Sequence, residues 1–132
     1  MSSATAQCVP ILVIEDEPSV MAYVRAALER NGYAVAPATS AVQALEMLNT
    51  GTFSGVISDM RTPGGKDGAD VFSWLELNRP EMARKLIFIT GDTVNEETAA
   101  TLRRTGAPYL EKPFRVQQLI EVVERTIGKT TK

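Results

Sequence analysis

Residues 11–16 read Ile-Leu-Val-Ile-Glu-Asp, four aliphatic residues followed directly by two carboxylates. An unbroken apolar run of this length is typical of a strand buried on both faces, as in a parallel sheet covered by helices. Three later strand-like runs also end beside a polar residue: Phe53–Ser58 before Asp59, Leu86–Ile89 before Thr90, and Tyr109–Glu111 before Lys112. Four predicted strands therefore each present a polar side chain where they end.

Helical segments alternate with these strands along the chain. Ser40 and Asn95 suit helix N-caps, and Gly51 and Gly106 suit the ends of the same helices. A further strand is expected at residues 33–36. The last helix is expected to bury a stripe of apolar side chains: Val116, Leu119, Ile120, Val123 and Ile127. Five βα units with short connections predict an α/β fold, a parallel sheet with helices on both faces.

The bulk composition describes an ordinary globular domain. At 132 residues the chain has the length of one domain, and its net charge of -2 does not indicate a surface that binds nucleic acid. Its apolar stretches are strand-sized, and the N-terminus lacks the pattern of a secretory signal, so we expect a cytoplasmic protein without membrane contact. We expect a disordered lead-in at 1–8, the folded domain at 9–128 and a tail at 129–132.

The chain contains no histidine and a single cysteine, Cys8. A chain without histidine cannot use a Ser/His/Asp or Cys/His mechanism, cannot supply imidazole to zinc, and cannot become phosphorylated on histidine. Cys8 has no partner for an internal disulfide and no histidine base, so we expect it to be structural.

The polar residues at the strand ends are candidates for one common site. The carboxyl ends of parallel strands lie along one edge of a sheet, where ligands bind. Glu15, Asp16 and Asp59 would therefore converge there with Thr90 and Lys112. Two carboxylates about 4 Å apart repel by roughly 1 kcal/mol in water and about 4 kcal/mol at an effective dielectric of about 20. A hard divalent cation with oxygen ligands would relieve that repulsion. Taken alone, each of these residues is also compatible with a structural role, such as a solvated loop that caps a helix.

These residue types indicate chemistry on phosphorus. An aspartate beside a metal and a lysine can attack phosphorus through a carboxylate oxygen and form an acyl phosphate, and Asp59 is the candidate nucleophile. Glu15 and Asp16 would hold the cation. Lys112 would neutralise the remaining charge, and the Thr90 hydroxyl would donate to a phosphoryl oxygen.

Over about residues 9–128, the chain resembles the receiver domain of two-component response regulators, including chemotaxis-type receivers. The motifs that carry the resemblance are Ile14-Glu15-Asp16-Glu17, Asp59-Met60 with Pro63, Asp67-Gly68, Ile89-Thr90-Gly91 and Lys112-Pro113-Phe114. Each motif is short, but five in order with suitable spacing are specific. The resemblance implies a flavodoxin-like, doubly wound (βα)5 fold with strand order 2-1-3-4-5.

The resemblance also implies a role for each site residue. Asp59 would accept a phosphoryl group from the phosphohistidine of a histidine kinase or a histidine phosphotransfer protein, and Lys112 would contact the phosphate. Mg2+ would be bound by Glu15, Asp16, Asp59 and the backbone carbonyl of Arg61. The domain would catalyse only its own phosphorylation and dephosphorylation, so it would not be an enzyme in the usual sense.

The resemblance also implies a switch that alters an output surface. Thr90 and Tyr109 would be the switch pair, and phosphorylation would alter the face formed by the fourth helix, the fifth strand and the fifth helix. An effector protein, or a second copy of the chain in a phosphorylation-dependent homodimer, are the partners considered for that face. The Lys112-Pro113 bond is expected to be cis, as in the family.

Two departures from the family pattern affect the site. Glu15 stands where the family often has aspartate, and the loop after Asp59 is one residue longer, near Gly64-Gly65. Arg61 and Asp92 each follow a site residue by two positions, so a salt bridge between them could screen the phosphorylated site from water. Two independent solvated side chains are the alternative.

Four other interpretations remain open at this stage. A haloacid-dehalogenase-like phosphohydrolase would carry a second aspartate where this chain has Arg61. A nucleotide-binding module would have a glycine-rich loop in place of residues 15–18. A degenerate receiver would dock partners without phosphorylation. The receiver could also be a piece of a hybrid histidine kinase or a multidomain regulator.

Overall fold

In the computed structural model, which describes residues 9–62, 64–91 and 95–129, the chain forms a five-stranded parallel sheet. The strand order is β2-β1-β3-β4-β5, which confirms the doubly wound α/β class. The strands are β1 (Ile11–Ile14), β2 (Val35–Ala38), β3 (Gly55–Asp59), β4 (Leu86–Thr90) and β5 (Tyr109–Glu111). The helices are α2 (Pro18–Arg30), α3 (Ala41–Thr50), α4 (Gly68–Asn78), α5 (Pro80–Ala83), α6 (Glu96–Thr105) and α7 (Val116–Thr126).

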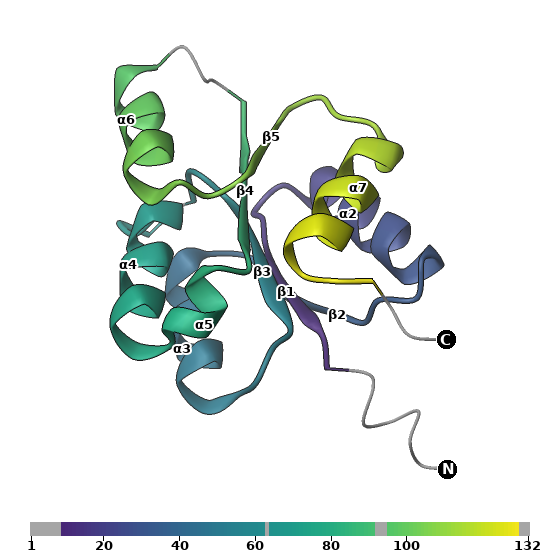
Figure 1. The fold of residues 1–132 in the computed structure, drawn as a ribbon, viewed down its shortest axis with the longest axis horizontal. Coiled ribbons are helices and arrows are strands. Elements are labelled where there is room, and N and C mark those ends of the chain that lie inside the picture. The colour runs from purple at the N-terminus through teal and green to yellow at the C-terminus, as the bar shows by residue number, and fades with distance from the viewer. Residues whose placement is uncertain (1–8, 63, 92–94, 130–132) are drawn as a thin grey trace.

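Helices cover both faces of the sheet. Figure 1 shows α3, α4, α5 and α6 on one side and α2 with α7 on the other. Two apolar cores result, and β1 contributes to both, with Leu12 and Ile14 in one and Ile11 and Val13 in the other. All four side chains are fully buried, as an unbroken apolar run predicts, and each contributes roughly 1.5–3 kcal/mol.

The predicted caps are present. The Ser40 hydroxyl accepts a hydrogen bond from the Gln43 amide, and the Asn95 side chain accepts one from the Thr98 amide. Gly106 ends α6 in the left-handed conformation, with φ of 66°. Among the described residues, no helix combines the length and apolar composition needed to cross a bilayer.

The second strand lies two residues later than the sequence predicts. The predicted range was 33–36, but β2 spans Val35–Ala38, because Tyr33 still belongs to the turn that ends α2. Its amide donates to the Leu28 carbonyl, and its hydroxyl donates to the Gly128 carbonyl. Pro37 is tolerated inside the strand because β2 is an edge strand.

Two helical details also differ from the prediction. The short helix α5 was not expected, and it buries Met82 and Ala83 in the core. In α7, Val116 is exposed rather than part of the buried stripe, whereas Val122 is buried. Val116 is the first residue of α7, and the buried stripe starts one turn later, at Leu119.

The loop after β3 brings α4 against the strand end. Gly64 and Gly65 both have positive φ angles, 97° and 86°, which accommodates the additional loop residue. Gly68 begins α4, and a Cβ atom there would lie 2.8 Å from the Asp59 carbonyl oxygen and 3.0 Å from the Phe88 ring. The absence of a side chain at Gly68 therefore allows α4 to start directly beside Asp59.

Gly68→Ala should destabilise the protein, although alanine normally has a higher helix propensity than glycine. We expect a loss of about 1–3 kcal/mol in the free energy of unfolding, since the added methyl group meets backbone that cannot easily move. Urea denaturation of the variant and of wild type measures this difference in the free energy of unfolding. Gly91→Ala is the matched control, because a Cβ atom there has no neighbour within 4 Å. Equal stability of the two variants would contradict this account of Gly68.

Candidate functional site

Four strands deliver the predicted site residues to one edge of the sheet. Asp59 and Thr90 are the last residues of β3 and β4, while Glu15 and Lys112 directly follow β1 and β5. Carboxylate oxygens of Glu15, Asp16 and Asp59 all lie within 4.8 Å of one another. The predicted convergence at the carboxyl edge is therefore present in the structure.

The cluster is buried unevenly. Glu15 is 1% exposed and Asp59 is 8% exposed, whereas the side chain of Asp16 lies in solvent. Thr90 is also buried. Glu15 directly follows β1, which is buried on both faces, whereas Asp16 lies in the bend that comes next. Two carboxylates are thus held in a poorly solvated environment, with a third at the surface.

Lys112 is the cation that faces this cluster. Its Nζ lies 2.9 Å from Asp59 Oδ2, 3.2 Å from Glu17 Oε1 and 3.4 Å from Glu15 Oε1. Burial alone would lower the Lys112 pKa, but the hydrogen bond and charge of Asp59, with the two glutamates, outweigh burial and raise it. The ammonium therefore stays protonated and offsets part of the negative charge.

Glu15 is the least satisfied carboxylate of the cluster. Burial, followed by the charge of Asp59, raises its pKa to about 7, although the Glu17 amide donates to Oε2 at 3.1 Å and Lys112 acts in the opposite direction. Among the described residues, none donates a hydrogen bond to the buried Oε1, and the Lys112 ammonium at 3.4 Å is its ion-pair partner. A buried carboxylate oxygen without a hydrogen bond lowers the free energy of unfolding by about 1–3 kcal/mol, unless a donor or a cation binds it.

The donor set fits a hard divalent cation. It offers only oxygen atoms, from three carboxylates, and one of these carboxylates contains the unsatisfied Oε1 of Glu15. Hard cations such as Mg2+ prefer oxygen ligands and tolerate partly hydrated sites. Lys112 alone leaves the cluster with excess negative charge, which a divalent cation would balance.

Asp59 faces a small cavity. A cavity of about 280 Å3 is lined by Asp59, Met60, Arg61, Thr90, Gly91 and Asn95. The Arg61 amide donates to Asp59 Oδ1 at 3.2 Å, so both carboxylate oxygens of Asp59 have a hydrogen-bond donor. The Thr90 carbonyl accepts from the Lys112 amide at 2.8 Å, which fixes the start of the loop after β5 against β4.

Other predicted residues lie outside this cluster. Tyr109 begins β5, opposite Phe88 in the register, and is 47% exposed on the molecular surface. The Lys112-Pro113 peptide bond is cis, as expected. Cys8, Pro63 and Asp92 lie outside the described residues, so the predicted Arg61–Asp92 salt bridge stays a prediction.

Two residues near the site had no predicted role in it. Glu17 forms an ion pair with Lys112, and Asn95, predicted only as a helix cap, also lines the cavity beside Asp59. The signal for Glu17 was its place directly after the acidic pair and before Pro18, at the N-cap of α2. The sequence contains no comparable signal for Asn95, because its position depends on how the loop before α6 runs.

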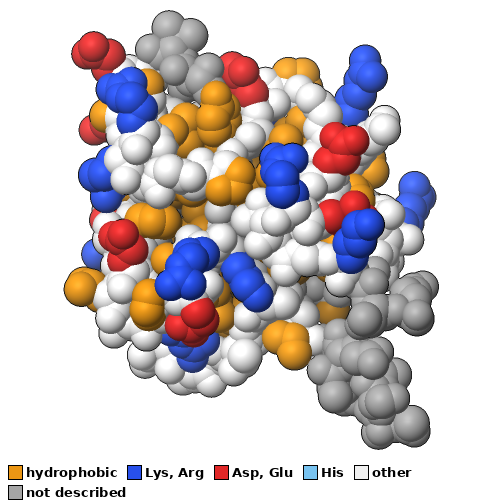
Figure 2. All heavy atoms as spheres, in the orientation of Figure 1, with side chains coloured by type: hydrophobic (Ala, Val, Ile, Leu, Met, Phe, Trp, Pro, Cys, Tyr) orange, Lys and Arg blue, Asp and Glu red, His pale blue; other side chains and the backbone are white. Residues whose placement is uncertain are grey.

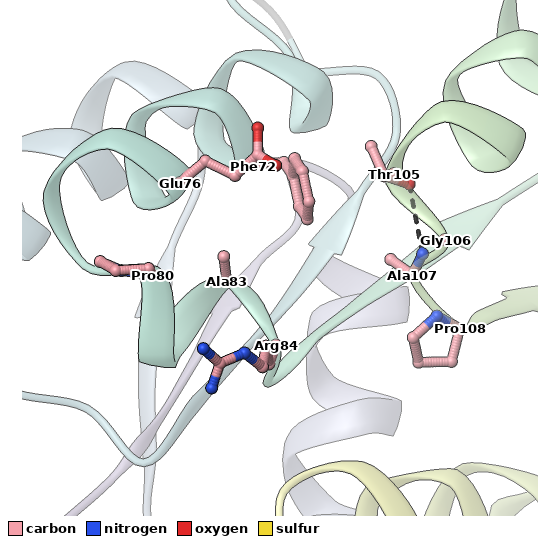
Figure 3. Close-up of a pocket in the computed structure, with 9 residues that line it drawn as sticks. All are labelled: Phe72, Glu76, Pro80, Ala83, Arg84, Thr105, Gly106, Ala107 and Pro108. Carbon is pink, nitrogen blue, oxygen red and sulfur yellow. Dashed lines mark hydrogen bonds between the residues drawn. The ribbon is translucent and has the colours of Figure 1, made fainter.

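A second cleft lies away from the acidic cluster. It has a volume of about 690 Å3 and is formed by α4, α5 and the segment before β5. Figure 3 shows Phe72 and Glu76 on α4 and Ala83 on α5, across the cleft from the Thr105–Pro108 turn. This cleft borders the amino ends of β4 and β5, so it belongs to the opposite edge of the sheet from Asp59.

The strand order and the carboxylates at the carboxyl edge of the sheet define the class of protein. It is a doubly wound α/β domain whose site lies at the carboxyl ends of the strands. The family follows from the comparison with known proteins. The model of the response regulator receiver domain matches residues 11–124, so the chain belongs to that family. Receiver domains of two-component systems act as signalling domains.

Similar proteins share this domain. The chain is 30% identical over 119 residues to the alginate biosynthesis transcriptional regulatory protein AlgB of Pseudomonas syringae pv. tomato, covering 90% of this chain and 26% of that protein. It is 32% identical to the receiver domain of NtrX from Brucella abortus, with a TM-score of 0.79, covering 89% of this chain and 97% of that one. The chain thus spans about a quarter of the length of the curated relative AlgB.

A further solved structure has the same fold. The receiver domain of the sensor histidine kinase PA1611 from Pseudomonas aeruginosa PAO1 is 24% identical, with a TM-score of 0.80, covering 92% of this chain and 99% of that chain. In that protein a magnesium ion is coordinated in the active site cleft.

The raised pKa of Glu15 predicts a pH-dependent cost in metal-free buffer. A carboxyl whose pKa is higher in the folded protein stabilises the fold while protonated, and this contribution is lost as the pH rises from 4.5 to about 7. Glu15→Gln cannot ionise, so its stability relative to wild type should increase between about pH 5 and about pH 8. Urea unfolding in the presence of a chelator measures this difference.

Glu46→Gln serves as the control for that experiment, because Glu46 lies exposed on α3. Its stability relative to wild type should be the same at both pH values. A Glu15→Gln variant whose advantage over wild type does not grow with pH would contradict the assigned pKa.

Proposed function

We propose that this domain takes a phosphoryl group from a partner's phosphohistidine onto Asp59, with Mg2+ bound beside it. The observation that carries the proposal is the 2.9 Å contact between Lys112 Nζ and Asp59 Oδ2, within a cluster of three carboxylates. The phosphohistidine lies outside these 132 residues, since they contain no histidine. A histidine kinase or a histidine phosphotransfer protein is therefore the proposed donor.

Asp59 is held in a suitable orientation for this reaction. One carboxylate oxygen accepts from the Arg61 amide and the other from Lys112, so the side chain cannot rotate freely. A carboxylate oxygen attacks phosphorus, an acyl phosphate bond forms, and the bond from phosphorus to the histidine nitrogen breaks with its electron pair remaining on nitrogen. Lys112 contacts the transferred group and neutralises part of its charge.

Mg2+ is the proposed cofactor. Glu15, Asp16, Asp59 and the backbone carbonyl of Arg61 are its proposed ligands, and the magnesium in the PA1611 receiver supports this choice. When bound, the cation supplies charge stabilisation to the transferring phosphoryl oxygens. Without it, Glu15 and Asp59 would repel an incoming phosphoryl group.

The output is proposed to pass through Thr90 and Tyr109. Thr90 is buried and lines the cavity beside Asp59, so its hydroxyl could donate to a phosphoryl oxygen. Movement of Thr90 would reach β5, the edge strand beside β4 that begins with the exposed Tyr109. The surface formed by α6, β5 and α7, along the upper part of Figure 1, is the proposed output face, for an effector or for a phosphorylation-dependent homodimer.

Several broader features remain part of the proposal. Acidic and basic side chains are intermixed on the face seen in Figure 2, which supports protein rather than direct nucleic-acid partners. Cytoplasmic localisation is the setting expected for such a domain. The chain covers about a quarter of AlgB, which supports the alternative that the receiver is a piece of a multidomain regulator or a hybrid histidine kinase.

Phosphorylation by acetyl phosphate tests the function. Wild type incubated with acetyl phosphate and Mg2+ should gain about 80 Da, the mass of one phosphoryl group, by intact mass spectrometry. Asp59→Asn should gain none, because its amide cannot form the acyl phosphate. Asp70→Asn is the control, since asparagine retains an oxygen for the α4 capping contact. An added mass that persists in Asp59→Asn would reject Asp59 as the acceptor.

A further inference from the structure

We propose that Tyr23 is a positioning residue for phosphoryl transfer, because it holds the loop that carries Lys112. The inference rests on the proposed function of Asp59 and Lys112. It adds a residue of α2 to the set that supports this function. Tyr23 lies in α2, and its hydroxyl and its ring both contact Phe114. It acts through the segment Lys112-Pro113-Phe114, which connects β5 to α7.

Tyr23 makes two contacts with this segment. Its hydroxyl donates to the Phe114 carbonyl at 2.9 Å, across 91 positions of sequence. Its ring meets the Phe114 ring edge-to-face, with centroids 5.8 Å apart and an interplanar angle of 63°. Aromatic pairs with this geometry are favourable beyond the area they bury. One side chain thus fixes both the backbone and the ring of Phe114.

The position of Phe114 limits the position of Lys112. Only Pro113 separates them, and its ring fixes one of the backbone dihedral angles in between. The Lys112 amide is bonded to the Thr90 carbonyl, so the segment is anchored on β4 at its start and on α2 at its end. Anchoring at both points restricts where the Lys112 side chain begins, and hence where Nζ meets Asp59.

The space around Tyr23 shows why this anchor matters. Tyr23, Lys112 and Phe114 line one cleft of about 610 Å3, together with Ser19, Val20, Gly91 and Pro113. Tyr23 is 42% exposed there, so close packing on all sides does not hold the segment in place. Without the hydroxyl bond, Phe114 could move into the cleft and draw Lys112 away from Asp59.

Tyr33 provides a matched comparison within the chain. Its hydroxyl donates to the Gly128 carbonyl at 2.7 Å, across 95 positions, and also ties an early segment to the end of α7. It packs against the same core as α2 and α7, but its bonded partner lies far along the chain from Lys112. Tyr33→Phe therefore removes an equivalent bond without loosening the segment of residues 112–114.

The test compares Tyr23→Phe and Tyr33→Phe with wild type. Both variants should lose a similar amount of stability in urea. Only Tyr23→Phe should slow phosphorylation by acetyl phosphate at saturating Mg2+, by about fivefold, the equivalent of one lost hydrogen bond. Its Mg2+ affinity, measured by calorimetry, should match wild type, because the proposed ligands do not include Tyr23.

Each outcome is decisive. An unchanged phosphorylation rate in Tyr23→Phe would overturn the inference while leaving the proposed function intact. An equal slowing in Tyr33→Phe would assign the effect to general stability and would also overturn it. If wild type takes up no phosphoryl group, the proposed function fails, and the role of Tyr23 fails with it.

Discussion

The site is organised around one ammonium group that faces three carboxylates. Lys112 Nζ lies within 3.4 Å of oxygens from Glu15, Glu17 and Asp59, and Asp16 adds further negative charge beside them. One positive charge cannot balance this group, and two of the carboxylates are buried where water screens poorly. Burial is the main cause of the raised pKa of Glu15, and the charge of Asp59 adds to it. The excess negative charge makes the site suitable for a divalent cation.

The fold holds these charges together against their repulsion. β1 and β3 are buried on both faces, so the strand ends that present Glu15 and Asp59 cannot easily separate. The missing side chain of Gly68 lets α4 begin against Asp59, and the Thr90 carbonyl fixes the start of the loop that carries Lys112. The free energy gained by packing the two cores therefore offsets the repulsion between the carboxylates of the site.

Much of this arrangement could be predicted from the sequence because parallel topology forces all carboxyl ends to one edge. The apolar runs located β1, β3 and β4, and the polar residue after each run located the site. Residues whose environment depends on tertiary contacts were harder to predict from the sequence. The turn bonds of Tyr33 displaced β2, the short helix α5 had no clear periodic signal, and the partner of Glu17 is a lysine 95 positions away. The sequence contains no sign of the different depths of Glu15 and Asp16, because these depend on the bend of the chain after β1.

The most direct test of the charge imbalance is the Mg2+ dependence of unfolding at about pH 8, where Glu15 is ionised. If the cluster binds the cation in the folded state only, the free energy of unfolding should rise by about 1.4 kcal/mol for each tenfold increase in free Mg2+ above the dissociation constant. Sodium chloride at matched ionic strength should not reproduce this rise. A free energy of unfolding that responds equally to both salts would contradict the account.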